Sequence, residues 1–123
     1  MTDFPSKNDL VIHFAHSAYR LAECFETRKT GISCFQTWTS EDTVARMGEA
    51  PVAVMSGFWR DAFLDMPGAL QFVQVSAAGY DQFDQARMAA GGLRLANASG
   101  VNMNAVSDHA MALMLGLMRQ LHL

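Results

Sequence analysis

Short apolar runs recur along the chain, and polar or glycine-containing segments separate them. Five of these runs have the length and the β-branched or aromatic content of β-strands. They cover residues 10–14, 32–38, 52–55, 70–75 and 93–96. The run at 52–55 is apolar without interruption, which is typical of a strand covered on both faces. The pattern therefore predicts five strands.

Helical patterns lie between the predicted strands. Ser17 stands at an N-cap position before residues 18–25, in which apolar side chains recur at helical spacing. Further short helices are expected to open at residues 40–43 and to cover residues 60–66 and 81–90. Because strands and helices alternate with short links, we expect an α/β domain with a parallel sheet of about five strands between layers of helices.

The last predicted helix differs from the others. It follows an N-cap at Asn102 or Asn104, begins at Ala105, ends at Leu121 and would be about 25 Å long. Residues 110–115 are apolar on every side, and a helix of this kind needs cover all round. That cover is expected to come from further polypeptide or from another copy of the chain. We therefore predict that the isolated chain self-associates through this helix, as a dimer.

Composition excludes several classes of function. Hydrophobic residues make up 50% of the chain and charged residues 17%, so disorder is not expected. The net charge is -3 and the nine Lys and Arg residues are scattered, so nucleic-acid binding is not expected. The N-terminal residues do not have the pattern of a signal peptide, and no apolar run is long enough to span a membrane. These features predict a cytoplasmic protein.

Thiol and imidazole side chains have bland interpretations. Cys24 and Cys34 have neither metal-ligand nor redox spacing, so we expect two buried thiols. His13 and His16 lie three residues apart, but no third ligand is near them and no metal is predicted. His109 is expected to be a partly buried histidine rather than a general base.

Ligands of parallel α/β sheets bind at the carboxyl ends of the strands. This rule selects residues 13–17, 55–59, 76–81 and 97–104 as the functional rim. Four small residues in a row, 76–79, would present bare N–H groups to an anion there, and an ordinary tight turn is the alternative. Asp81 and Asp84 either pair their carboxylates or cap the next helix, and capping is favoured. Phe58 and Trp59 either wall a pocket or belong to the core.

Common cofactor loops are missing from this rim. The turn at residues 15–18 is not the Ser-, Thr- and Gly-rich loop that binds a flavin phosphate, and strands one and three are not followed by the acidic residues of a phosphoacceptor domain. The 123 residues contain neither a Gly-x-Gly-x-x-Gly motif nor a Walker-type loop. A dinucleotide pyrophosphate site is therefore not expected within them.

Four motifs, in their order and spacing, resemble the N-terminal part of the D-isomer-specific 2-hydroxyacid dehydrogenases. They are Ser56-Gly-Phe-Trp59, Ser76-Ala-Ala-Gly-Tyr-Asp81, Leu95-Ala-Asn-Ala-Ser-Gly100 and Asn104-Ala-Val-Ser-Asp-His-Ala-Met-Ala-Leu-Met-Leu115. The resemblance implies a flavodoxin-like, three-layer substrate-binding domain at residues 1–101 and a linker helix at residues 102–123 that would lead into a Rossmann domain. It also implies an oxidoreductase that interconverts 2-oxo acids and D-2-hydroxy acids with NAD or NADP.

The resemblance assigns six positions to substrate or cofactor. The substrate-binding candidates are Ala78 and Gly79, through their backbone amides, Phe58 and Trp59, through the wall of the pocket, and Asn102; the cofactor-binding candidate, near the nicotinamide, is Val106. The family's catalytic Arg, Glu and His are expected outside these 123 residues. No catalytic residue is therefore assigned, and His109 is not a substitute for the missing base.

The leading hypothesis is a fragment or truncated form of an NAD(P)-dependent D-2-hydroxyacid dehydrogenase that is inactive alone and does not bind the cofactor tightly. Two alternatives stay open. One is a non-enzymatic module of the same fold that binds a small carboxylate or serves as an interaction domain. The other is a purely structural dimer built on the last helix.

Overall fold

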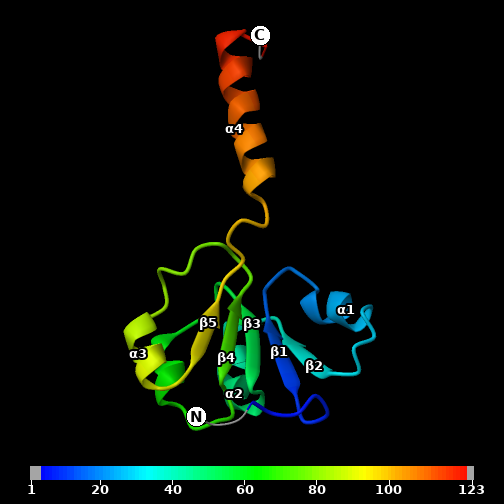
Figure 1. Ribbon diagram of the computed structural model, residues 1–123, viewed down its shortest axis with the longest axis vertical. Helices are drawn as coiled ribbons and strands as arrows, with labels where there is room; N and C mark the ends of the chain where they lie inside the picture. Colours follow the sequence, from blue (N-terminus) through cyan, green and yellow to red (C-terminus); the bar gives the residue numbers. More distant parts are fainter. Residues whose placement is uncertain (1–3, 122–123) are drawn as a thin grey trace.

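The computed structural model describes residues 4–121 as a parallel sheet with helices on both faces and one projecting helix (Figure 1). The strands are β1 (Val11–Ala15), β2 (Ser33–Thr37), β3 (Val52–Met55), β4 (Phe72–Val75) and β5 (Arg94–Ala96). They lie in the order β2-β1-β3-β4-β5, and each neighbouring pair is parallel. The predicted five-stranded sheet is confirmed, and its order is the flavodoxin-like one.

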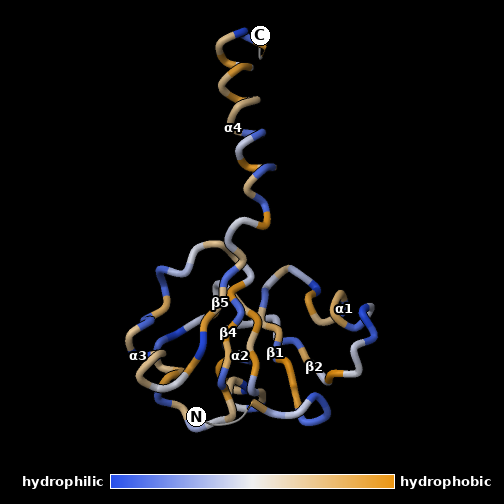
Figure 2. The backbone as a smooth tube through the Cα atoms, in the orientation of Figure 1, coloured by the Kyte–Doolittle hydropathy of each residue, from blue (hydrophilic) through white to orange (hydrophobic). Residues whose placement is uncertain are grey.

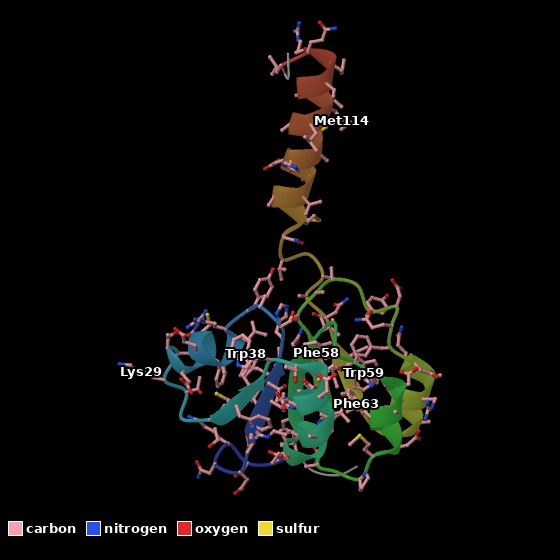
Figure 3. The ribbon with its side chains drawn as sticks, turned by 180° about the vertical axis from the view of Figure 1, so that it is seen from behind. Lys29, Trp38, Phe58, Trp59, Phe63 and Met114 are labelled. Carbon is pink, nitrogen blue, oxygen red and sulfur yellow. The ribbon has the colours of Figure 1, made fainter. Side chains whose placement is uncertain are left out.

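The helices and 3₁₀ turns cover the two faces unequally. They are α1 (Leu21–Glu26), α2 (Ser40–Arg46), η1 (Met47–Glu49), η2 (Asp61–Asp65), α3 (Gln85–Ala90) and α4 (Met103–Met118). One face packs against α1 around the buried residues Ile12, Phe14 and Val52. The other face, which Figure 3 shows from its own side, packs against α2, η1, η2 and α3. Alternating strand positions thus supply two cores, and the predicted three-layer arrangement is confirmed.

Two predicted helix starts are wrong, for local reasons. Helix α1 begins at Leu21 instead of residue 18, and Arg20 stands at its N-cap position without a side-chain cap. The N–H groups of Ala18 and Tyr19 bond instead to Nδ1 of His16, at 3.0 and 2.9 Å, which holds this stretch in a turn. Helix α3 likewise begins at Gln85, later than predicted.

The start of α3 confirms the capping interpretation for Asp84 but not for Asp81. Oδ1 of Asp84 accepts a hydrogen bond of 3.0 Å from the N–H of Arg87, as an N-cap side chain does. Asp81 lies in the exposed turn before the helix. These two carboxylates therefore have different environments, and capping accounts for Asp84.

Helix α4 projects away from the sheet (Figure 1). It spans Met103–Met118 instead of the predicted residues 105–121, and the side chain of Asn102 at the N-cap position makes no capping bond. None of its residues is buried, and Figure 2 shows apolar residues along its outer half. Met114, for example, is 51% exposed and points into solvent (Figure 3).

Two further predictions are tested by burial. The expectation of two buried thiols is wrong, because Cys24 is exposed and Cys34 is only partly buried. Within the described residues, no helix is long and apolar enough to cross a membrane. The same part of the chain contains no cluster of side chains that could hold a metal ion.

Candidate functional site

The candidate site lies at the end of the sheet formed by the C-termini of all five strands. Because the strands are parallel, the loops after β1, β3, β4 and β5 meet at this end, next to the start of α4 (Figure 1). The strand order reverses between β1 and β3, and this switch point is where open α/β sheets leave a crevice for ligands. The loops selected from the sequence are thus brought together by the fold.

The loop after β4, residues 76–79, is tied down by its carbonyl groups. The carbonyl of Ala77 accepts the N–H of Ala98 at 3.0 Å. The carbonyl of Ala78 accepts Nδ2 of Asn97 at 2.8 Å. At the start of the loop, the N–H of Ser76 donates to the carbonyl of Met55 at 3.0 Å. The loop is therefore held between β3 on one side and the loop after β5 on the other.

The amides of this loop are left free. Among residues 4–121, no acceptor bonds to the N–H of Ala78 or Gly79, and both residues are exposed. A side chain added at Gly79 would meet no heavy atom within 4 Å. The φ of Gly79 is not positive, so the glycine keeps the space above the amides open, while the turn itself does not require it. Two adjacent free N–H groups in such a loop can bind an anionic oxygen.

Asn97 is a site residue that sequence reasoning did not single out. Its side-chain amide donates to the carbonyl of Ala78 and, at 2.8 Å, to Oγ of Ser99. These bonds orient the Ala78 peptide so that its carbonyl faces inward, toward β5. The residue lies within the predicted rim, but its partner is 19 positions away, and only the β4–β5 pairing makes that contact visible.

A small cavity of about 90 Å³ opens at the switch point between the loops after β1 and β3. It is lined by Ala15, His16, Ser17, Ser56, Gly57 and Phe58. Phe58 therefore stands on the wall of a cavity. The residues with polar side chains among those lining this cavity are His16, Ser17 and Ser56.

Trp59 lies in the core instead. Its side chain is only 8% exposed and packs between the rings of Phe63 and Phe83, with centroid distances of 5.6 and 4.9 Å. Its indole N–H donates to Oδ1 of Asp61 at 3.0 Å. Figure 3 shows Phe58, Trp59 and Phe63 on this side of the sheet. Trp59 thus anchors the loop that carries Phe58 and lines none of the cavities described.

His13 is fully buried and belongs to a polar chain inside the fold. Oγ1 of Thr43 donates to the carbonyl of Thr39 at 2.7 Å, so it accepts from Oγ1 of Thr37 at 2.8 Å. Oγ1 of Thr37 must then accept from Nε2 of His13 at 2.8 Å. The imidazole therefore carries its hydrogen on Nε2, and its buried Nδ1 has no partner among the described residues.

The environment of His13 favours the neutral ring. Burial lowers the pKa of His13 from 6.5 to about 4, and the positive charge of Arg46 lowers it further than Glu49 raises it. The ring also stacks on Phe35, at a centroid distance of 4.5 Å. Arg46 lies 3.8 Å from the centroid of the same phenyl ring. His13 therefore ties α2 to the sheet.

The remaining predicted positions lie on α4. Asn102 and Val106 are both exposed, and the N–H of Val106 bonds to the carbonyl of Asn102 at 3.0 Å in the first turn. His109 is exposed too, so the expectation of a partly buried histidine is wrong. These residues stand beyond the rim, at the start of the projecting helix and along it.

Two other cavities help to delimit the site. One of about 200 Å³ is lined by Tyr80, Gln85, Leu95, Ala96 and Asn97, next to the loop at residues 76–79. Another, of about 220 Å³, lies around Met47 and Leu93 near the N-terminal ends of the strands. The larger of these is far from the free amides, so cavity size alone does not locate the site.

Comparison with known proteins agrees with this geometry. The family model described as "D-isomer specific 2-hydroxyacid dehydrogenase, catalytic domain" matches residues 11–114. The chain belongs to this family. The match covers all five strands, the loops of the rim and most of α4. No curated protein sequence matches the chain.

Solved structures of similar fold include larger enzymes. The pyruvate reductase of Chlamydomonas reinhardtii is 21% identical, with a TM-score of 0.69, and the match covers 94% of this chain and 37% of that one. An NADPH-dependent glyoxylate/hydroxypyruvate reductase from Sinorhizobium meliloti, in complex with NADP and malonate, is 22% identical, with a TM-score of 0.69. The match covers 94% of this chain and 36% of that one. A D-lactate dehydrogenase from Treponema pallidum is 18% identical, with a TM-score of 0.71, and the match covers 89% of this chain and 36% of that one. The chain thus spans little more than a third of these proteins.

Proposed function

We propose that this chain is the substrate-binding part of a D-2-hydroxyacid dehydrogenase and that the amides of Ala78 and Gly79 hold the carboxylate of a 2-oxo acid. The observation that carries this proposal is the loop at residues 76–79. Its carbonyls are bound by Asn97 and Ala98, and its N–H groups are free. An N–H pair fixed from behind needs no reorganisation to receive a carboxylate, which is the basis of preorganised binding.

The proposed reaction needs more than these residues. The nicotinamide of NAD or NADP would supply the hydride that reduces the 2-oxo acid, but the chain's printed sequence has no glycine-rich loop to hold a dinucleotide. We therefore assign no cofactor step to this chain alone. Its own residues orient the substrate, and Phe58 bounds the side-chain end of the pocket. In this proposal Asn102 and Val106 face the substrate and the nicotinamide from the start of α4.

A substitution at Gly79 tests the carboxylate site. Gly79→Leu would place a side chain over the two amides without a clash, because nothing lies within 4 Å of the added Cβ and the φ is not positive. Ala89→Leu is the matched control, since the added bulk lies on the exposed side of α3, away from the loop. Hydrogen bonds to a charged group are worth about 1.5–3 kcal/mol. Ligand-detected NMR with oxamate, an unreactive 2-oxo acid mimic, should show binding at least tenfold weaker in Gly79→Leu only.

Equal affinities of the two variants and the unsubstituted chain would contradict the assignment.

A second test concerns catalysis. The chain mixed with NADH and a panel of 2-oxo acids should leave the absorbance at 340 nm unchanged, while a complete D-lactate dehydrogenase in the same cuvette oxidises NADH. Robust turnover by the chain alone would refute the proposed division of labour between substrate-binding part and cofactor-binding part.

A second proposed property is self-association through α4. Apolar side chains that are 51–79% exposed run along the whole helix, and Leu113 and Leu117 border a groove of about 240 Å³ at Ala112 and Gly116. Exposed apolar surface of this extent is unusual on a monomer, and small residues let two helices approach closely. In a longer polypeptide, a following domain would cover the same surface. A non-enzymatic carboxylate-binding module would share the loop at residues 76–79, and the oxamate test would detect it equally.

A further inference from the structure

The cavity at the switch point has His16 among the residues of its wall. Nδ1 of His16 accepts two backbone N–H groups, from Ala18 and Tyr19, at 3.0 and 2.9 Å. An imidazole nitrogen that accepts hydrogen bonds carries no hydrogen, so the hydrogen of the neutral ring is on Nε2. No described residue accepts a bond from this Nε2. His16 is also held by stacking on Tyr19, at a centroid distance of 4.2 Å.

The cavity suits one small polar group. Its volume of about 90 Å³ is about three times the 30 Å³ that one water molecule occupies in the liquid, which is room for a carboxylate. Besides His16, Ser17 and Ser56 line it. Imidazole and hydroxyl groups can each donate a hydrogen bond, and a carboxylate is stabilised by donors that surround it. The wall of Phe58 separates this polar end from the core.

The cavity and the free amides follow strands that lie two positions apart in the sheet. Strands β1 and β4 flank β3, and neighbouring strands are about 4.8 Å apart, so the ends of β1 and β4 are separated by about 10 Å. A hydrogen bond at each end spans about 2.9 Å. By this estimate the ligand must bridge at least about 4 Å between its outer oxygen atoms. Gly57 also lines the cavity, and a side chain added there would meet nothing within 4 Å.

We infer that the His16 cavity is a distal subsite for the second carboxylate of a four- or five-carbon 2-oxo dicarboxylic acid. The inference rests on the proposed function, because the first carboxylate must lie on the amides of Ala78 and Gly79. It assigns His16 as the residue that determines how many carbons the substrate has and which group stands at its far end. Pyruvate would occupy only the amide end.

The test compares 2-oxoglutarate with 2-oxopentanoate, which has the same number of carbons and no second carboxylate. Both are titrated into the ¹⁵N-labelled chain while the backbone amides and the Nε2 resonance of His16 are followed by NMR. His16→Asn is the matched variant, since an Asn side chain can accept the same two backbone N–H groups but does not reach into the cavity. His16→Phe, which also removes that acceptor, separates a loss of the turn from a loss of the donor.

The inference predicts that 2-oxoglutarate binds about tenfold more tightly than 2-oxopentanoate, shifts Nε2 of His16 and loses this advantage in His16→Asn. Pyruvate should bind both proteins equally. Equal binding of the two five-carbon acids, or a preference that survives in His16→Asn, would overturn the inference and leave the proposed function standing. If no 2-oxo acid shifts the amides of Ala78 and Gly79, the proposed function fails as well.

Discussion

The buried His13 makes stability depend on pH in a direction that the structure fixes. Its pKa is lowered from 6.5 to about 4, mainly because burial disfavours the imidazolium. The unfolded chain therefore binds a proton at this residue before the folded chain does as the pH falls. The contribution of neutral His13 is fully present above pH 6.5 and is lost as the pH falls toward 4.

The size of this effect follows from the same values. A tenfold change in an equilibrium constant corresponds to 1.36 kcal/mol, so a pKa lowered from 6.5 to about 4 removes about 2.5 kcal/mol of stability between pH 7.5 and pH 4.5. This is a large part of the total for a domain of this size, since folded proteins are stable by about 5–15 kcal/mol.

The perturbation that isolates His13 is His13→Gln, whose side-chain amide can still donate to Oγ1 of Thr37. Urea unfolding of both proteins is followed by circular dichroism at pH 7.5 and pH 4.5. Carboxyl groups titrate in both proteins and cancel in the comparison. The original chain should lose about 2.5 kcal/mol more than the variant over this range. An equal loss in both proteins, or an NMR titration of His13 with a pKa near 6.5, would refute the reasoning.

Two further predictions concern packing and association. Gly68→Ala should destabilise the domain by about 1–3 kcal/mol, because an added Cβ would lie 2.6 Å from Cα of Gly48. In the control Gly57→Ala, the added Cβ meets nothing within 4 Å, so the midpoint of urea unfolding should change little. Similar midpoints for the two variants would contradict the close approach of Gly68 to Gly48. Leu117→Glu places a charge beside the groove on α4 and should abolish concentration-dependent association in sedimentation velocity, while Ala89→Glu on the exposed side of α3 should not. A monomeric original chain would count against this role of α4.

The strands were predictable because their signal is local. The apolar run at residues 52–55 coincides with β3 (Val52–Met55), since a strand buried on both faces needs no polar alternation. The order of the sheet is not local. Nothing within β1 or β3 specifies that they pair with each other, and the choice depends on how the whole chain packs. The resemblance to a family supplied that order.

Side-chain hydrogen bonds explain most of what the sequence did not reveal. His16 accepts the N–H groups that a helix would otherwise start with, so α1 begins later than its apolar spacing predicts. Asn97 and Ala78 meet across 19 positions, and the polar chain from His13 joins a strand to residues of α2. Cys34 lies on the edge strand β2, Cys24 on α1 and His109 on the projecting helix α4. Their exposure depends on how each element packs in the whole fold, which periodicity alone does not determine.

The central claim is that the amides of Ala78 and Gly79 bind the carboxylate of a 2-oxo acid. The most direct measurement is a ¹H–¹⁵N correlation spectrum of the labelled chain during a titration with pyruvate. The account predicts that these two amide resonances shift the most and follow one saturating curve. The amide resonances around Met47 and Leu93, near the N-terminal ends of the strands, should not shift. Saturating shifts elsewhere, with Ala78 and Gly79 unchanged, would contradict it.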